Sequence, residues 1–458
     1  MPGVSSLFGA DAPAPAPAGP GPGRSPGVEA SVASTSSRSP EVNADGTITF
    51  RLQAAGAKTV RLMTDFPKLG DVPVNGSAGF DMTKDANGVW THTSPKLAPS
   101  VYQYWFIVDG VATPDPQNTF VRPGSGVYKS MVTLPGKEAE WMLFRDVPHG
   151  NLTEHHYLNK ENKVARRVVI YTPPDYATSG KSYPVIYLLH GANDYERGWT
   201  QSGMANLIMD NLIADGKAVP AIIVMPFGHD TSGSTGKQSE IRALQASLGY
   251  TPPAGRGGGP GRGGPGAPAA GAPAAGAPGA PAAGGRGAGG RGGLPTDPAA
   301  RDAAIAEAAK APIPAPSYME KDLLGYVIPY VEKEFRVLKD KNKRAIMGYS
   351  MGGGHSTVIG WSHPELFAYV GGMSGYTGAT SPITARLLTD PAKTNKDFKI
   401  LFIGSGVEDT AINGGRTLHQ LFTEKGVKHL WSEDPGYGHD YQIWRQYFSR
   451  LAQQMFRD

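Results

Sequence analysis

Residues 344–359, RAIMGYSMGGGHSTVI, carry the clearest signal of the fold. The first four of these residues predict a buried strand, and Gly348-Tyr349-Ser350-Met351-Gly352 then predicts a sharp turn into a helix. The flanking glycines leave room for a tight turn, which would hold Ser350 at the N-terminus of the helix, above the sheet. We interpret Ser350 as a nucleophile; the alternative is a glycine-rich helix start that serves packing alone.

Around this stretch, short apolar runs alternate with helical patterns from about residue 138 to the C-terminus. The apolar runs lie at 167–171, 185–189, 221–225, 344–347, 368–372 and 399–403, and the clearest helical patterns at 318–335 and 415–425. Buried strands that alternate with helices predict a doubly wound α/β sheet.

Residues 41–136 predict a separate β-domain. Short alternating or apolar runs lie at 47–52, 59–62, 89–93, 102–108 and 127–134. Asp109-Gly110 predicts a hairpin turn. Several short strands in one segment are typical of a small β-sandwich, here expected to be immunoglobulin-like. Trp90, Tyr104 and Trp105 either fill its core or stack on a sugar, and we name no glycan site there.

Two segments are rich in Gly, Ala and Pro, which account for much of the 61 Gly and 40 Pro among 458 residues. Residues 1–40 are expected to be a disordered tail, because they cannot bury enough apolar surface to offset their ordering entropy. Residues 252–316 are expected to be a disordered insertion that interrupts the α/β domain at 138–458. Within it, 302–310 is expected to form a helical turn or two. The insertion is either a spacer or a mobile lid over the active site.

The composition excludes several classes of function. The absence of cysteine excludes a disulfide scaffold, a cysteine-ligated metal site and a cysteine nucleophile. A formal net charge of +4 gives little reason to expect nucleic-acid binding. A transmembrane helix needs a run of about 18 apolar residues, and the sequence has no such run. Residues 1–40 also lack the apolar core of a signal peptide. We therefore expect a cytoplasmic protein, or one whose signal was removed or missed at the gene start.

A nucleophilic serine needs a base and an acid, which follow it along the chain in this fold. Among 11 histidines, His439 has the right position, since it lies in a glycine-flanked loop between the last predicted strand and the last helix. The loop after the strand at 399–403 offers Asp409 as the acid, with Glu408 as the alternative.

The oxyanion formed in such a reaction needs two backbone N–H groups. We expect one from Met351, the residue after the nucleophile. The other is expected from the loop after the strand at 185–189, which reads His190-Gly191-Ala192-Asn193-Asp194. Ala192 is the preferred donor and Gly191 the alternative. No metal or organic cofactor is implied.

These motifs occur in an order that resembles the esterase D / carbohydrate esterase family 1 group of α/β-hydrolases. The resemblance is carried by residues 171–176, 190–191, 225–229, 348–352, 406–409 and 438–444. It covers nearly all of 138–458 outside the insertion. Its Gly-x-x-Asp turn favours Asp409 over Glu408, and its Gly-His-Asp-aromatic motif favours His439. The segment at 101–110 similarly resembles early-set domains of carbohydrate-binding module family 48.

The resemblance implies a serine carboxylesterase that acts on feruloyl or acetyl esters of plant cell-wall polysaccharide, and a secreted or periplasmic location. Alternatives are a siderophore esterase of the enterochelin type, a broad aryl-ester or polyester hydrolase, and a glycan-binding protein whose hydrolase domain has decayed. The expected partner is an ester substrate, with no nucleic acid and no membrane. Acyl specificity and oligomeric state stay open.

Overall fold

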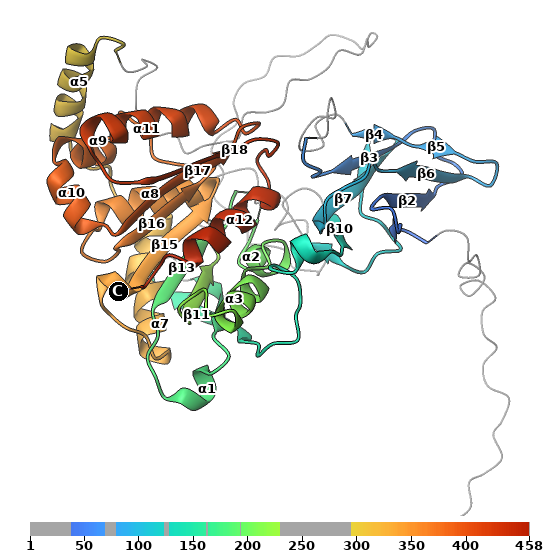
Figure 1. Cartoon of the computed structure of the whole chain (residues 1–458), viewed down its shortest axis with the longest axis horizontal. Helices are drawn as coiled ribbons and strands as arrows, with labels where there is room; N and C mark the ends of the chain where they lie inside the picture. Colours follow the sequence, from blue (N-terminus) through green and yellow to red (C-terminus); the bar gives the residue numbers. More distant parts are fainter. Residues whose placement is uncertain are drawn as a thin grey trace, which may run out of the picture.

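The computed structural model describes residues 38–68, 79–122, 128–161, 164–192, 194–229 and 295–457. Nearly all of the predicted tail lies outside these residues, as does the 252–294 part of the predicted insertion. The described chain forms an all-β domain followed by an α/β domain, drawn in blue and in green to red in Figure 1. The predicted fold class, an α/β domain preceded by a β-sandwich, is confirmed.

The β-domain consists of two antiparallel sheets. One has the order β1 (Glu41–Val42), β2 (Ile48–Gln53), β6 (Val89–Thr93), β5 (Thr83–Lys84). The other has the order β4 (Phe80–Asp81), β3 (Val60–Thr64), β7 (Ser100–Val108), β10 (Lys129–Leu134), β9 (Val121–Arg122), and β8 (Val111–Thr113) pairs with β7. Inward-facing side chains of both sheets join in one core, as expected for a sandwich.

The three aromatic residues named above as core or sugar-stacking candidates differ in burial. Trp90 and Tyr104 are buried in the sandwich core. Trp105 is partly exposed, and Lys129 Nζ lies 4.6 Å from the centroid of its ring. The alternation along β7 explains the difference, because neighbouring side chains point to opposite faces of the sheet.

The α/β domain is built on a single sheet. Its strand order is β11 (Asn151–Asn159), β12 (Val164–Thr172), β14 (Ile222–Pro226), β13 (Val185–Leu189), β15 (Arg344–Tyr349), β16 (Tyr369–Met373), β17 (Ile400–Gly406), β18 (Leu430–Asp434). Pairing is antiparallel for β11, β12 and their contact with β14, and parallel from β14 to β18. The loops after β13, β15, β16, β17 and β18 therefore meet at one edge of the sheet, where ligands bind in open α/β folds.

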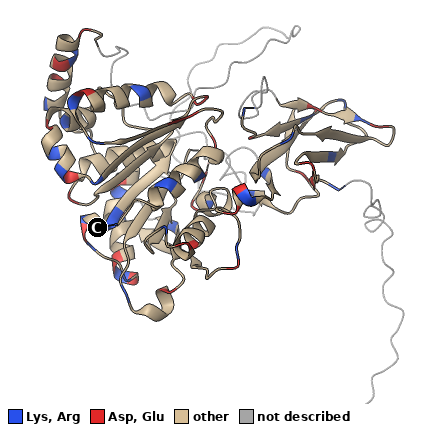
Figure 2. Cartoon of the chain, viewed as in Figure 1, with Lys and Arg blue, Asp and Glu red and all other residues tan. Residues whose placement is uncertain are grey.

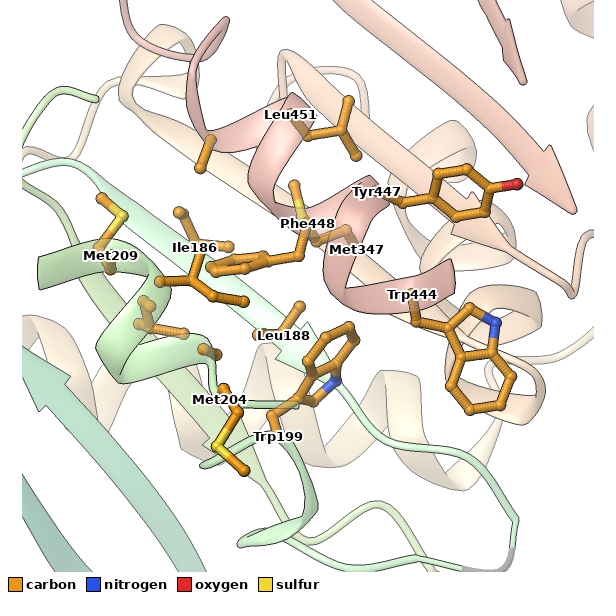
Figure 3. Packing of buried hydrophobic residues seen from close by; sticks show 14 of the residues in the cluster. Ile186, Leu188, Trp199, Met204, Met209, Met347, Trp444, Tyr447, Phe448 and Leu451 are labelled. Carbon is orange, nitrogen blue, oxygen red and sulfur yellow. The ribbon is translucent and has the colours of Figure 1, made fainter. Parts of the chain in front are cut away.

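Helices cover both faces of this sheet. One face packs against α2 (Gly198–Gln201), α3 (Ala205–Ala214) and α12 (Tyr441–Ala452). The other packs against α6 (Tyr318–Asp322), α7 (Ile328–Glu334), α8 (Met351–Ser362), α9 (Pro382–Thr389) and α11 (Ile412–Lys425). Figure 3 shows the first face, where Phe448 of α12 lies near Ile186 of β13, and Leu451 of the same helix lies near Met347 of β15. Burial on both faces explains why the strands read as continuous apolar runs.

The last part of the predicted insertion is ordered, so the prediction of disorder over 252–316 is wrong there. Helix α5 (Pro298–Lys310) is longer than the turn or two expected. It begins at the N-cap Asp297, whose carboxylate accepts a hydrogen bond from Ala300 N at 2.8 Å. Ile305 is 2% exposed and packs into the core beneath the helix. Arg386 of α9 donates to the carbonyls of Ala309 and Ala311.

Buried polar contacts join the two domains. Gln442 of α12 accepts a hydrogen bond from Ser100 Oγ at 2.6 Å and donates to Val101 O at 2.8 Å. Arg445, which is fully buried, donates to the same carbonyl at 3.0 Å. Since β7 supplies both Ser100 and Val101, α12 docks directly on the β-domain.

Charges of both signs are interspersed over the surface helices, including α5 (Figure 2). Within the described ranges, no helix is long and apolar enough to cross a membrane.

Candidate active site

Ser350 occupies the turn between β15 and α8, as the sequence predicts. Its φ of 54° and ψ of −121° are strained for a residue other than glycine. Its N–H donates to Met373 O at 2.8 Å, which ties the turn to the end of β16. Because α8 begins at Met351, the serine lies at the positive end of a helix dipole, a position that stabilises developing negative charge.

The glycines around this turn allow close approach between loops. A Cβ on Gly352 would lie 2.6 Å from the carbonyl oxygens of Leu189 and His190. A Cβ on Gly191 would lie 3.3 Å from Cβ of Ser350. The loop after β13, predicted to supply an oxyanion donor, therefore lies directly against Ser350.

Asp409 and His439 are brought together by the loops after β17 and β18. His439 Nδ1 donates to the carboxylate of Asp409, at 3.0 Å from Oδ2 and 3.1 Å from Oδ1. Ala411 N also donates to this carboxylate, at 2.8 Å. Burial alone would raise the pKa of Asp409, but the contact with His439 and the other hydrogen bonds lower it below its ordinary value. The carboxylate is therefore ionised at neutral pH and keeps the histidine in one orientation.

Trp444 links the turn of Ser350 to this pair. Its ring stacks on that of Tyr349, with centroids 3.9 Å apart, and meets the ring of His439 edge to face at 5.0 Å. Its Nε1 donates to Ser374 Oγ at 2.9 Å. Ser374 in turn donates to Asp409. Ser350, Asp409 and His439 are thus held by one packed set of side chains at the same edge of the sheet.

His190 fixes the loop that carries Ala192. Gly228 N donates to His190 Nε2 at 2.8 Å, so the proton lies on Nδ1, which donates to Gly191 O at 2.8 Å. Burial lowers the pKa of His190 to about 4, so it is neutral near pH 7. Ala192 follows directly in this anchored loop, and Met351 is the first residue of α8, where backbone N–H groups have no partner within the helix.

Several residues of this site were not singled out from the sequence. Asp194 accepts hydrogen bonds from the hydroxyls of Tyr349 and Tyr441 and pairs with Arg122 of the β-domain. Asp194, Tyr349 and Tyr441 lie inside the motifs quoted above, so the sequence offered a signal for each of them. No local signal marks Arg122, because its partner lies 72 positions away in another domain.

Three known proteins illustrate what the chain is similar to. An endo-1,4-beta-xylanase/feruloyl esterase of Xylanibacter ruminicola is 26% identical over 426 residues, which cover 91% of this chain and 46% of that protein. The chain thus spans about half the length of this relative. The enterobactin esterase of Shigella flexneri superposes with a TM-score of 0.54 at 17% identity, covering 89% of this chain and 92% of that one. A ferulic acid esterase of Anaeromyces mucronatus gives a TM-score of 0.45 at 18% identity, covering 74% of this chain and 98% of that one.

The likeness to the Shigella flexneri structure shows the fold of the chain, which is an α/β-hydrolase fold. The Esterase family model matches residues 160–247 and 296–455. The unmatched stretch between them ends just before α5, so the insertion is shorter than predicted at its C-terminal end. The two matched segments make up more than half of the chain, and this protein therefore belongs to the Esterase family.

Proposed function

We propose that the protein is a serine carboxylesterase that hydrolyses feruloyl or acetyl esters of plant cell-wall polysaccharide. The observation that carries this proposal is the hydrogen bond between His439 and Asp409 at the sheet edge where the strained turn holds Ser350. Membership of the Esterase family supports ester hydrolysis. The choice of acyl group follows the resemblance and the bifunctional relative of Xylanibacter ruminicola.

The proposed chemistry uses only side chains and backbone of this chain. Ser350 Oγ attacks the ester carbonyl carbon while His439 accepts the hydroxyl proton. The N–H groups of Met351 and Ala192 hold the oxyanion. His439 then protonates the leaving alcohol, which departs and leaves an acyl-serine. Water, deprotonated by the same histidine, releases the acid. Asp409 orients the imidazole and stabilises its charged form.

A crevice between the domains supports a polymeric substrate. It has a volume of about 380 Å³, and its lining includes Trp141, Tyr437, Glu138 and Gln446. Tyr437 precedes His439 by two residues. Aromatic side chains beside polar ones are typical of sites that bind small organic molecules. Trp141→Ala should slow release of ferulate from xylan and leave methyl ferulate hydrolysis unchanged. Phe144→Ala, which removes an exposed aromatic outside this lining, is the control.

The test of the enzyme class is Ser350→Ala measured on p-nitrophenyl acetate. Loss of a triad nucleophile lowers turnover by roughly 10⁶-fold. Ser362→Ala is the control, because Ser362 ends the same helix and its hydroxyl has no hydrogen-bond partner among the described residues. A phosphonate probe should label Ser350 alone. Activity in Ser350→Ala, or labelling elsewhere, would refute the assignment of Ser350 as the nucleophile. A wild-type protein without activity would instead favour a glycan-binding protein with a decayed hydrolase domain.

The substrate class needs its own comparison. Methyl ferulate, acetylated xylan and a catecholate trilactone should be hydrolysed at different rates, with one of the first two preferred. Preference for the trilactone would instead support the alternative of a siderophore esterase, and equal rates a broad aryl-ester hydrolase. The secreted or periplasmic location implied by the resemblance stays a prediction.

A further inference from the structure

An arginine of the β-domain is buried against the proposed active site. Arg122, at the end of β9, reaches into the α/β domain, where its Nη2 lies 2.5 Å from Asp194 Oδ2. The side chains are 7% and 1% exposed. On the side of the β-domain, Arg122 Nη1 donates to Gln103 Oε1 at 3.2 Å. The ion pair therefore spans the domain boundary and is shielded from water.

Asp194 connects three parts of the proposed catalytic machinery. Its carboxylate accepts hydrogen bonds from Tyr349, the residue before Ser350, and from Tyr441, two residues after His439, the latter at 2.6 Å. Asp194 itself ends the loop that carries Ala192. One carboxylate thus holds the nucleophile turn, the histidine loop and the oxyanion loop in register.

This arrangement depends on a positive charge. Burial would raise the pKa of Asp194, but the charge of Arg122 lowers it below its ordinary value. A buried carboxylate that loses its ion-pair partner either takes up a proton or draws in water, and both weaken its hold on neighbouring hydroxyls. A shift of about 1 Å in a catalytic group can cost roughly 10²-fold in rate.

We propose that Arg122 is a positioning residue for catalysis: the β-domain supplies the charge that fixes Asp194 and, through Tyr349 and Tyr441, the geometry of Ser350 and His439. The inference rests on the proposed esterase function. It assigns the β-domain a role in the turnover of small esters.

The test compares Arg122→Met, Arg122→Lys and the wild-type full chain on p-nitrophenyl acetate. Arg122→Met should lower kcat by about 10- to 100-fold with KM changed less than threefold. Arg122→Lys, which keeps the charge, should recover part of the loss. Arg61→Met is the matched control, because Arg61 pairs with Asp81 at 3.0 Å in an exposed position of the same domain. It should leave both constants unchanged.

The double variant Arg122→Met/Asp194→Asn guards against a folding defect. It removes both charges and keeps an oxygen that accepts from the tyrosines, so it should be folded and more active than Arg122→Met alone. A folded Arg122→Met with wild-type kcat, or a double variant no better than the single one, would overturn the inference. Wild-type hydrolysis that depends on Ser350 would still support the esterase function in that case.

Discussion

His439 Nδ1 lies 3.0 Å from Oδ2 of Asp409, whereas the adjacent Glu408 faces Lys68 of the β-domain, with 3.6 Å between its Oε1 and Lys68 Nζ. Two neighbouring acids in one loop thus have different partners. The side chain of Asp409 is fully buried and that of Glu408 is 26% exposed. This difference in contact and burial assigns the proposed catalytic role to Asp409.

Asp409→Asn should therefore lose far more activity than Glu408→Gln. The amide cannot hold the imidazole in the required tautomer, and the corresponding change in serine proteases lowers kcat by about 10⁴-fold. Glu408→Gln removes an exposed ion pair, so its effect should stay below about tenfold. Steady-state kinetics on p-nitrophenyl acetate measures both. The reverse ranking would move the acid to Glu408.

Gly375→Ala should disable the nucleophile turn without unfolding the protein. A Cβ at Gly375 would lie 2.0 Å from Ser350 O and 3.0 Å from its Cα, so the turn must shift. We expect a loss of roughly 10²-fold in kcat/KM, as for other misplacements of about 1 Å. Gly378→Ala is the matched control, because a Cβ there has no atom within 4 Å. Equal activity of the two variants would contradict the described turn.

Asp440→Asn should change how stability depends on pH. Burial, together with the charge of Asp65, raises the pKa of Asp440 to about 7. The folded state thus disfavours the ionised carboxylate, so this group costs stability progressively from about pH 4 to pH 7, by about 1.4 kcal/mol per unit of pKa shift. Asparagine keeps the N-cap acceptor for Gln442 N and does not titrate.

Denaturant unfolding at pH 5 and pH 8 provides the measurement for Asp440→Asn. The free energy of unfolding of the variant minus that of wild type should be larger at pH 8 than at pH 5. Asp434→Asn is the control of opposite sign: burial opposes ionisation there too, but Ser432 and Arg450 lower the pKa of Asp434 overall. That variant should be less stable than wild type at pH 8. If Asp440→Asn changes the free energy of unfolding by the same amount at both pH values, the pKa of Asp440 is not raised.

Ile305→Ala should destabilise the α/β domain by about 2–5 kcal/mol, the usual cost of such a truncation in a core. The reason is that Ile305 is the buried residue of α5. Glu307→Ala, on the exposed side of the same helix, should change stability by less than about 0.5 kcal/mol. Thermal or denaturant unfolding compares the two. Equal effects would mean that α5 does not pack on the domain in solution.

The sequence alone predicted those features that depend on short windows of the chain. The strand–turn–helix at 344–359 is encoded by an apolar run followed by glycines, and Ser350 lies where this pattern places it. The alternation of apolar runs and helices predicted the α/β sheet for the same reason. The β-sandwich followed from alternation of period two along strands such as β2 and β3.

Helix α5 could not be predicted with its full length, because its composition resembles the low-complexity stretch before it. Its order comes from one buried isoleucine and from hydrogen bonds that Arg386 of a distant helix donates to its last turn. Composition describes only the residues of a segment, whereas packing depends on the surface against which the segment lies.

The order of elements and the position of Ser350 could therefore be predicted from the sequence, because local backbone preferences and apolar periodicity specify them. The sequence already favoured Asp409 over Glu408, but the contact of Asp409 with His439 and the pairing of Asp194 with Arg122 are seen only in the tertiary structure. Those pairings join loops after different strands, and in the case of Arg122 two domains. These contacts form only when the sheet has assembled and the β-domain packs against it. A short segment of the sequence therefore cannot predict them.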